Sequence, residues 1–163
     1  LICTGKGMGG GVPLSGVIGK SEIMDLPEVG NMSSTHSANP LVCTAGLAVL
    51  EEIEEKQLIS QTNLKSKILF DGLNSLKEKY PKKISYIFGK GLIAAILFKK
   101  TNSNAPDSAF ASKVSEICMQ KGLLVVHTGR ESIKIGPPLT ITNEALLEGI
   151  EVLDAAIYEA SNS

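Results

Sequence analysis

A lysine stands inside a glycine-rich segment near the start of the chain. The segment GKGMGGG (residues 5–11) follows an apolar run at residues 1–4 and holds Lys6 among five glycines. Glycines permit unusual backbone angles and the close approach of a ligand. A lysine amine held at the end of a strand can act as a nucleophile and form a Schiff base with an aldehyde cofactor. A glycine-rich turn with a solvated lysine is the alternative, and the loop composition alone favours it.

Two segments of the same region resemble phosphate-binding motifs, but neither meets the requirements of its motif. Residues 5–10 satisfy the pattern GxGxxG of dinucleotide-binding proteins, and Asp25 lies about 20 residues further on. That motif must open a helix, whereas the sequence GVPLSGV of residues 11–17 cannot form its first turns. Residues 19–21 (GKS) resemble the end of a P-loop, but the earlier glycine of that motif would fall at Leu14. Neither pattern predicts nucleotide binding here.

The elements around Lys6 are expected to be short. We predict strands at residues 1–4 and 14–18 around the loop 5–13, and one helical turn at 20–25. The lysine is therefore expected in a connection between two strands.

Two long helices are predicted next. The first runs from Leu41 to about Glu55, with Asn39 as its N-cap and Pro40 at its first position. The second runs from about Ser60 to Tyr80 and is ended by Pro81. Its apolar face is predicted to contain Leu64, Ile68, Leu69, Leu73 and Leu76.

The rest of the chain alternates short strands with helices, so that residues from about 57 onward indicate a compact α+β unit with small sheets covered by helices. The predicted elements are strands at 84–88 and 92–98, a helix from Asp107 to Gly122, strands at 123–126 and 132–135, and a last helix capped by Thr142.

Composition and charge exclude several function classes. Sixteen basic and seventeen acidic residues nearly cancel, Trp is absent and aromatic residues make up 4%. A nucleic-acid partner is therefore not expected. No apolar run reaches the length of a membrane span, and no signal peptide is visible, so no membrane partner is expected. Cys3, Cys43 and Cys118 form no CxxC pair, which predicts no zinc site and a reducing, cytoplasmic location.

Three segments together resemble a known enzyme family. They are GKGMGGGVPLS (residues 5–15), STHSANPL (34–41) and IKIGPPLTIT (133–142). In this order they are similar to the signatures of class III aminotransferases, which are pyridoxal-phosphate (PLP) enzymes of fold type I. Each signature alone is weak, but three in the right order over most of the chain are quite specific.

The resemblance implies an α/β fold in which this chain is the C-terminal portion of a longer protein. Residues 1–38 would be the incomplete end of the large PLP-binding domain. Residues 39–56 would form a connecting helix, and residues 57–163 a small α+β C-terminal domain. The acidic partner of the cofactor ring, the stacking ring and the phosphate loop of the family lie upstream of the lysine, so we expect the chain alone to be inactive.

The resemblance also implies roles for three residues. Lys6 matches the lysine that carries PLP as a Schiff base and then works as general acid and base. Thr35 matches a threonine that binds the PLP phosphate of a neighbouring subunit, which implies a homodimer; a loop residue in an ST-turn is the alternative. Lys134 stands where many members have a substrate-binding arginine, so it would offer a point charge to a carboxylate. A solvated edge-strand lysine is as plausible, and neither Arg130 nor His36 is given a role.

The predicted function is the transfer of an amino group between an amine or amino acid and a keto acid. A PLP-dependent racemase, epimerase, aminomutase or decarboxylase of the same fold is one alternative, because the residues that decide the chemistry at Cα lie outside this sequence. A non-catalytic dimerisation or binding module is the other.

Overall fold

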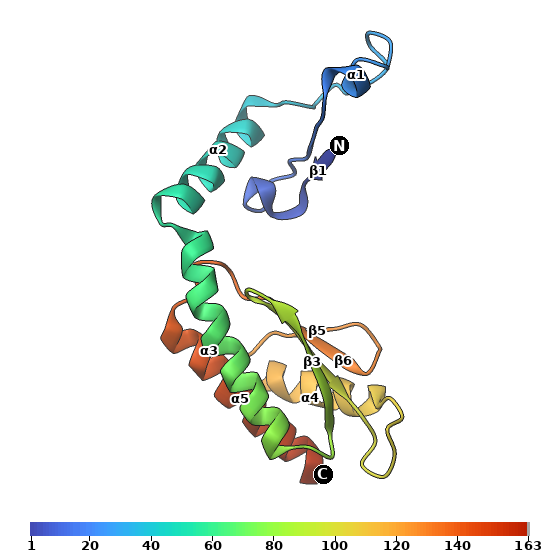
Figure 1. Cartoon of the computed structure of the whole chain (residues 1–163), viewed down its shortest axis with the longest axis vertical. Coiled ribbons are helices and arrows are strands. Elements are labelled where there is room, and N and C mark those ends of the chain that lie inside the picture. Colours follow the sequence, from blue (N-terminus) through green and yellow to red (C-terminus); the bar gives the residue numbers. More distant parts are fainter. Residues whose placement is uncertain (163) are drawn as a thin grey trace. The chain divides into compact units, whose positions relative to one another are not determined.

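The computed structural model describes residues 1–162 and divides the chain into two compact units, Leu1–Leu58 and Ile59–Ser163. Figure 1 shows the ribbon of the chain, with the first unit in blue to teal and the second in green to red. Each unit is described by itself.

The first unit contains a two-stranded sheet and one long helix. Strands β1 (Ile2–Thr4) and β2 (Gly16–Ile18) pair antiparallel, with Cys3 opposite Val17. The connection between them carries a single 3₁₀ turn, η1 (Lys6–Gly9), and a short helix α1 (Ser21–Met24) follows β2. The two predicted strands and the predicted helical turn are confirmed, with shorter bounds for the strands.

Helix α2 (Pro40–Glu55) begins as its sequence predicts. The side chain of Asn39 accepts a hydrogen bond of 2.9 Å from the backbone N–H of Leu41, and Pro40 occupies the first helical position. Both devices are favourable because the first N–H groups of a helix lack partners within the helix.

The second unit is a four-stranded antiparallel sheet with three helices, and its strand order is β3-β4-β6-β5. Its elements are α3 (Leu58–Lys79), whose first residue belongs to the other unit, β3 (Ile84–Lys90), β4 (Ile93–Phe98), α4 (Ser108–Gln120), β5 (Val126–His127), β6 (Ser132–Ile135) and α5 (Asn143–Asn162). Asp107 and Thr142 cap α4 and α5, as predicted, through hydrogen bonds of 3.0 and 3.1 Å from the N–H groups of Phe110 and Ala145.

The core of this unit lies between one face of the sheet and the helices. Side chains alternate along each strand, so Ile96 and Ile133, which pair across β4 and β6, point to the same face and are both fully buried. They join one cluster with residues of all three helices, among them Leu73 and Val114. The opposite face of the sheet is apolar but exposed, and it carries Tyr86, Phe88, Ile93 and Val126.

Two details of the sequence prediction are wrong. Leu64 is 73% exposed, because it lies five residues before Leu69 and a helix turns by about 140° over that distance beyond one full turn. Residues 123–125 are not in a strand, and β5 is reduced to Val126–His127. The predicted loop after β1 contains the 3₁₀ turn η1, which begins at Lys6.

The three cysteines differ in environment. Cys3 is exposed, Cys43 is half-buried, and all three are free thiols. Cys118 in α4 is fully buried in the core, and this burial raises its pKa to about 11. A thiol in this state stays protonated and acts as a small apolar side chain.

Candidate functional site

Lys6 lies directly after β1, at the first position of the turn η1. Its φ angle is 56°, in the left-handed region that non-glycine residues rarely adopt. That conformation costs about 1–2 kcal/mol for a residue with a Cβ. Its side chain is exposed, and among the described residues no carboxylate forms an ion pair with its amine. Backbone strain of this kind is often found at functional sites.

The turn is held against helix α2 by glycines on both sides. Gly10 ends the turn with φ 63°, and its N–H donates to the carbonyl of Gly7 at 3.1 Å. A side chain at Gly10 would begin 3.0 Å from Val49 of α2. Gly46 is the buried residue of α2, and any side chain there would collide with Leu14. Small residues on the helix thus let the lysine loop approach closely, which fixes the place of Lys6.

Thr35 lies in the exposed turn that precedes α2. The alternative interpretation places its hydroxyl in an ST-turn, where it would accept from a nearby backbone N–H. The side-chain hydrogen bond of this turn is a different one, from the Oγ of Ser37 to the carbonyl of Ser34 at 2.7 Å. Within the described part of the chain the hydroxyl of Thr35 has no hydrogen-bond partner. It is therefore available to a ligand.

Lys134 lies on the exposed face of the central strand β6, between Ala95 of β4 and Val126 of β5. Arg130 lies in the loop before β6, where its Nε is 4.0 Å from Glu131. Lys6 and Thr35 thus belong to the first unit and Lys134 to the second. His36 is exposed next to Thr35, and it makes no hydrogen bond or ion pair with the residues of 1–162.

The second unit holds an apolar cavity that the sequence did not predict. Its volume is about 310 Å³, and it is bordered by α3, α5, the segments Leu123–Val126 and Lys134–Pro138, and Ile141. Lys134 is the only charged residue in its lining. The apolar run at 123–126 was a signal for this feature, but it was interpreted as a strand.

The sequence analysis also did not predict that one lysine is buried. Lys65 is 9% exposed and is the one buried charged residue in the described part of the chain. Its Nζ donates a hydrogen bond of 3.2 Å to the carbonyl of Leu139, which follows the two prolines after β6. Lys65 lies four residues before Leu69 and hence on the inward face of α3. The helical period could have placed Lys65, rather than Leu64, on that face.

The described residues contain neither a metal-binding cluster nor a membrane-spanning helix. Over residues 1–162, no three His, Cys, Asp or Glu side chains are grouped so as to hold a metal ion. Within the same range, none of the helices has the length and apolar character required to cross a membrane.

Comparison with known proteins gives consistent matches along nearly the whole chain. The family model described as aminotransferase class-III matches residues 1–157. The 4-aminobutyrate aminotransferase of Escherichia coli (strain K12) is 34% identical over 158 residues, which cover 95% of this chain and 37% of that protein. A leucine/methionine racemase of Thermococcus litoralis is 38% identical over 163 residues, which cover 98% of this chain and 36% of that protein.

A solved structure agrees with these relatives. The acetylornithine aminotransferase of Elizabethkingia anophelis superposes with a TM-score of 0.86 at 32% identity, covering 96% of this chain and 38% of that one. The chain thus spans little more than a third of the length of the proteins that it matches.

Proposed function

The chain belongs to the class III aminotransferase family, and on this basis we propose that its protein transfers an amino group between an amine or amino acid and a keto acid. The observation that carries the proposal is Lys6, an exposed amine on a strained turn at the end of β1. The family depends on PLP, which, when bound, supplies an electron sink for the carbanion formed at the substrate Cα.

The residues of the first unit fit such a cofactor in two respects. Lys6 presents a primary amine that no described carboxylate neutralises, so it is available to attach an aldehyde. Thr35 presents a free hydroxyl that can donate a hydrogen bond to a phosphate oxygen. By resemblance to the family, that phosphate belongs to the cofactor of a second subunit, and we therefore propose a homodimer.

The chain's own residues would then divide the work. Lys6 Nζ would hold the cofactor, and its amine would move a proton to and from the substrate Cα. The rigid contact of its loop with Gly46 of α2 would keep Nζ within reach of that carbon. Lys134 would attract the substrate carboxylate as a point charge, a weaker and less directional contact than an arginine fork makes. A cytoplasmic location remains a prediction.

Racemisation is the second candidate, because the relative with 38% identity is named a leucine/methionine racemase. Both reactions begin with removal of the Cα proton, and Lys6 is suited to either. They differ in whether the amino group leaves the substrate. A non-catalytic binding or dimerisation role is the third candidate. In that role Lys6 would take no part in catalysis.

One experiment separates the three. The full-length protein is incubated with PLP and single-enantiomer amino acids, with and without a keto acid, and both keto-acid exchange and optical inversion are followed. We expect exchange that disappears in Lys6→Ala and persists in Lys20→Ala, a control at an exposed lysine of the same unit. Inversion without exchange would favour the racemase, and equal exchange in Lys6→Ala would reject Lys6.

A further inference from the structure

We propose that Thr4 and Met8 position Lys6, because a hydrogen bond between their side chains holds the lysine turn in its strained conformation. The Oγ1 of Thr4 donates to the Sδ of Met8 at 3.4 Å. Thr4 is the last residue of β1 and Met8 lies in η1, so the bond joins residues on either side of Lys6. The inference rests on the proposed function, in which Lys6 carries the cofactor.

The backbone of the turn needs such a restraint. Lys6 lies between Gly5 and Gly7, and glycine reaches many backbone angles at little cost. The φ of 56° at Lys6 is unfavourable for a residue with a Cβ, so it persists only where neighbouring contacts oppose its relaxation. A backbone hydrogen bond of 3.2 Å, from the N–H of Met8 to the carbonyl of Gly5, also crosses Lys6. Met8 is therefore attached in two ways to the residues that precede the lysine.

Thr4 and Met8 each contact a regular element. Thr4 pairs with Gly16 in the ladder of β1 and β2, and a Cβ at Gly16 would lie 3.7 Å from the Cγ2 of Thr4. The carbonyl of Met8 lies beside helix α2, 3.9 Å from the position that a Cβ of Gly46 would take. Both side chains are half-buried, and a hydrogen bond is stronger where water is partly excluded. The bond thus connects the sheet to the part of the turn that lies against α2.

The expected size of the effect follows from the strength of one hydrogen bond. The loss of a neutral hydrogen bond shifts a conformational equilibrium about fivefold. Without this bond, the open form of the turn should therefore be populated about five times more often. A displacement of about 1 Å in a reacting group can slow an enzyme about 100-fold. An open turn would move the Nζ of Lys6 from its place, so the bond affects the rate through the lysine.

The first test measures the turn without the cofactor. Hydrogen exchange of the backbone amides of residues 5–12 is followed in the full-length, cofactor-free protein. Thr4→Val keeps the branched shape and removes the hydroxyl, and Met8→Leu keeps the apolar volume and removes the sulfur. Each should speed hydrogen exchange in this segment about fivefold, whereas Thr4→Ser should leave it unchanged. Thr44→Val, which loses a bond of 2.8 Å within α2, is the control and should not affect the segment.

A double variant tests whether the two side chains act through one bond. If they do, Thr4→Val combined with Met8→Leu should exchange no faster than either single variant. Multiplication of the two effects, or unchanged hydrogen exchange in both single variants, would overturn the proposal. If Thr4→Val does not fold, Met8→Leu is compared with the parent protein, and unchanged exchange in Met8→Leu overturns the proposal.

The second test measures the turnover of the full-length protein with PLP. Thr4→Val should lower kcat, by at most about fivefold, and leave KM close to that of the parent, and Thr4→Ser should restore kcat. An unchanged kcat in Thr4→Val would show that the bond does not position Lys6. Failure of the proposed function is seen separately, because unchanged keto-acid exchange in Lys6→Ala would reject it whatever the hydrogen exchange of the turn shows.

Discussion

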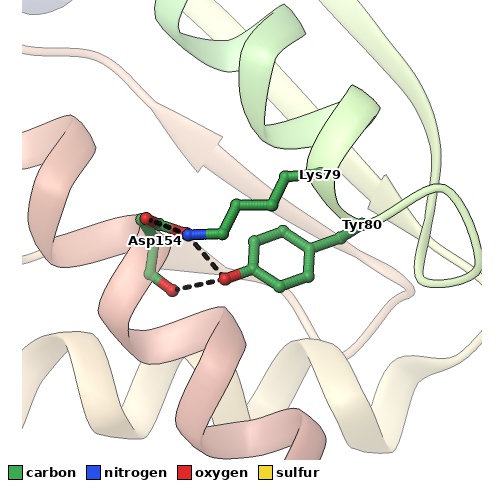
Figure 2. A network of polar contacts seen from close by, with 3 residues as sticks. All are labelled: Lys79, Tyr80 and Asp154. Carbon is green, nitrogen blue, oxygen red and sulfur yellow. Dashed lines mark hydrogen bonds and ion pairs between the residues drawn. The ribbon is translucent and has the colours of Figure 1, made fainter.

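The hydroxyl of Tyr80, just after the end of α3, donates a hydrogen bond of 2.6 Å to the Asp154 carboxylate of α5. The ammonium of Lys79 meets the same carboxylate at 2.8 and 2.6 Å, and Figure 2 shows the three side chains converging. Burial opposes ionisation of Asp154, but the hydrogen bonds from Lys79 and Tyr80 outweigh it and lower its pKa. The ionised carboxylate thus links the two helices.

Asp154→Asn should make the unfolding free energy of the second unit less dependent on pH in the acidic range. A carboxyl whose pKa is lowered by folding stabilises the protein above its ordinary pKa of 3.8 and loses that effect as the pH falls through the folded value. We expect the variant to be about 1 kcal/mol less stable at pH 7, given a partly exposed pair. This difference should shrink below pH 3.8, as measured by urea unfolding. Asp71→Asn, at an exposed position of α3, is the control and should show no such trend.

Thr62→Val should stabilise the protein. The hydroxyl of Thr62 in α3 is buried and has no hydrogen-bond partner in the described structure, a state that costs about 1–3 kcal/mol. Valine keeps both branches of the side chain and removes the polar atom, so a gain of about 1 kcal/mol in unfolding free energy is expected. Thr44→Val is the control: it removes a real bond, of 2.8 Å to the carbonyl of Pro40, and should not stabilise. A loss of stability in Thr62→Val would mean that the hydroxyl has a partner.

Two replacements of Lys6 should distinguish the loss of its amine from the relief of its backbone strain. Lys6→Ala and Lys6→Gly both remove the amine, and neither should retain covalently bound cofactor in the full-length protein. Glycine tolerates the φ of 56° without penalty, so Lys6→Gly should be more stable than Lys6→Ala by about 1 kcal/mol. Visible absorption and thermal unfolding measure the two effects. Equal melting temperatures would argue against strain at this residue.

Thr35→Ala should weaken cofactor retention in the full-length protein. A hydrogen bond to a charged group contributes about 1.5–3 kcal/mol, so a loss of roughly tenfold or more in PLP affinity is expected. Thr35→Ser keeps the hydroxyl and should stay close to the parent. Ser33→Ala, in the same exposed segment, is the control. An unchanged PLP titration in Thr35→Ala would remove Thr35 from the site.

The sequence predicted features that depend on a few neighbouring residues. The caps at Asn39, Asp107 and Thr142 were read correctly because a side chain and the next turn decide them. The extended run at 123–126 was misjudged, since local propensity could not show that its first three residues leave the sheet.

Features that need distant segments escaped prediction. The Lys65 to Leu139 bond joins residues 74 positions apart, and the cavity requires α3, α5 and the sheet to be in place. Lys6 was predicted as a site residue from its glycine neighbours, but its left-handed backbone was not predicted. That angle occurs in a loop that packs against α2, a contact that no local pattern reveals.

Because Cys118 is buried, the rate at which a thiol reagent modifies it measures how often the second unit opens. Its thiol is inaccessible and protonated in the folded state, so a thiol reagent can modify it only during excursions that expose α4. Cys3, which is exposed, reacts without any such excursion and gives the reference rate within the same molecule. The ratio of the Cys118 labelling rate to the Cys3 labelling rate therefore reports how often the core of the second unit opens.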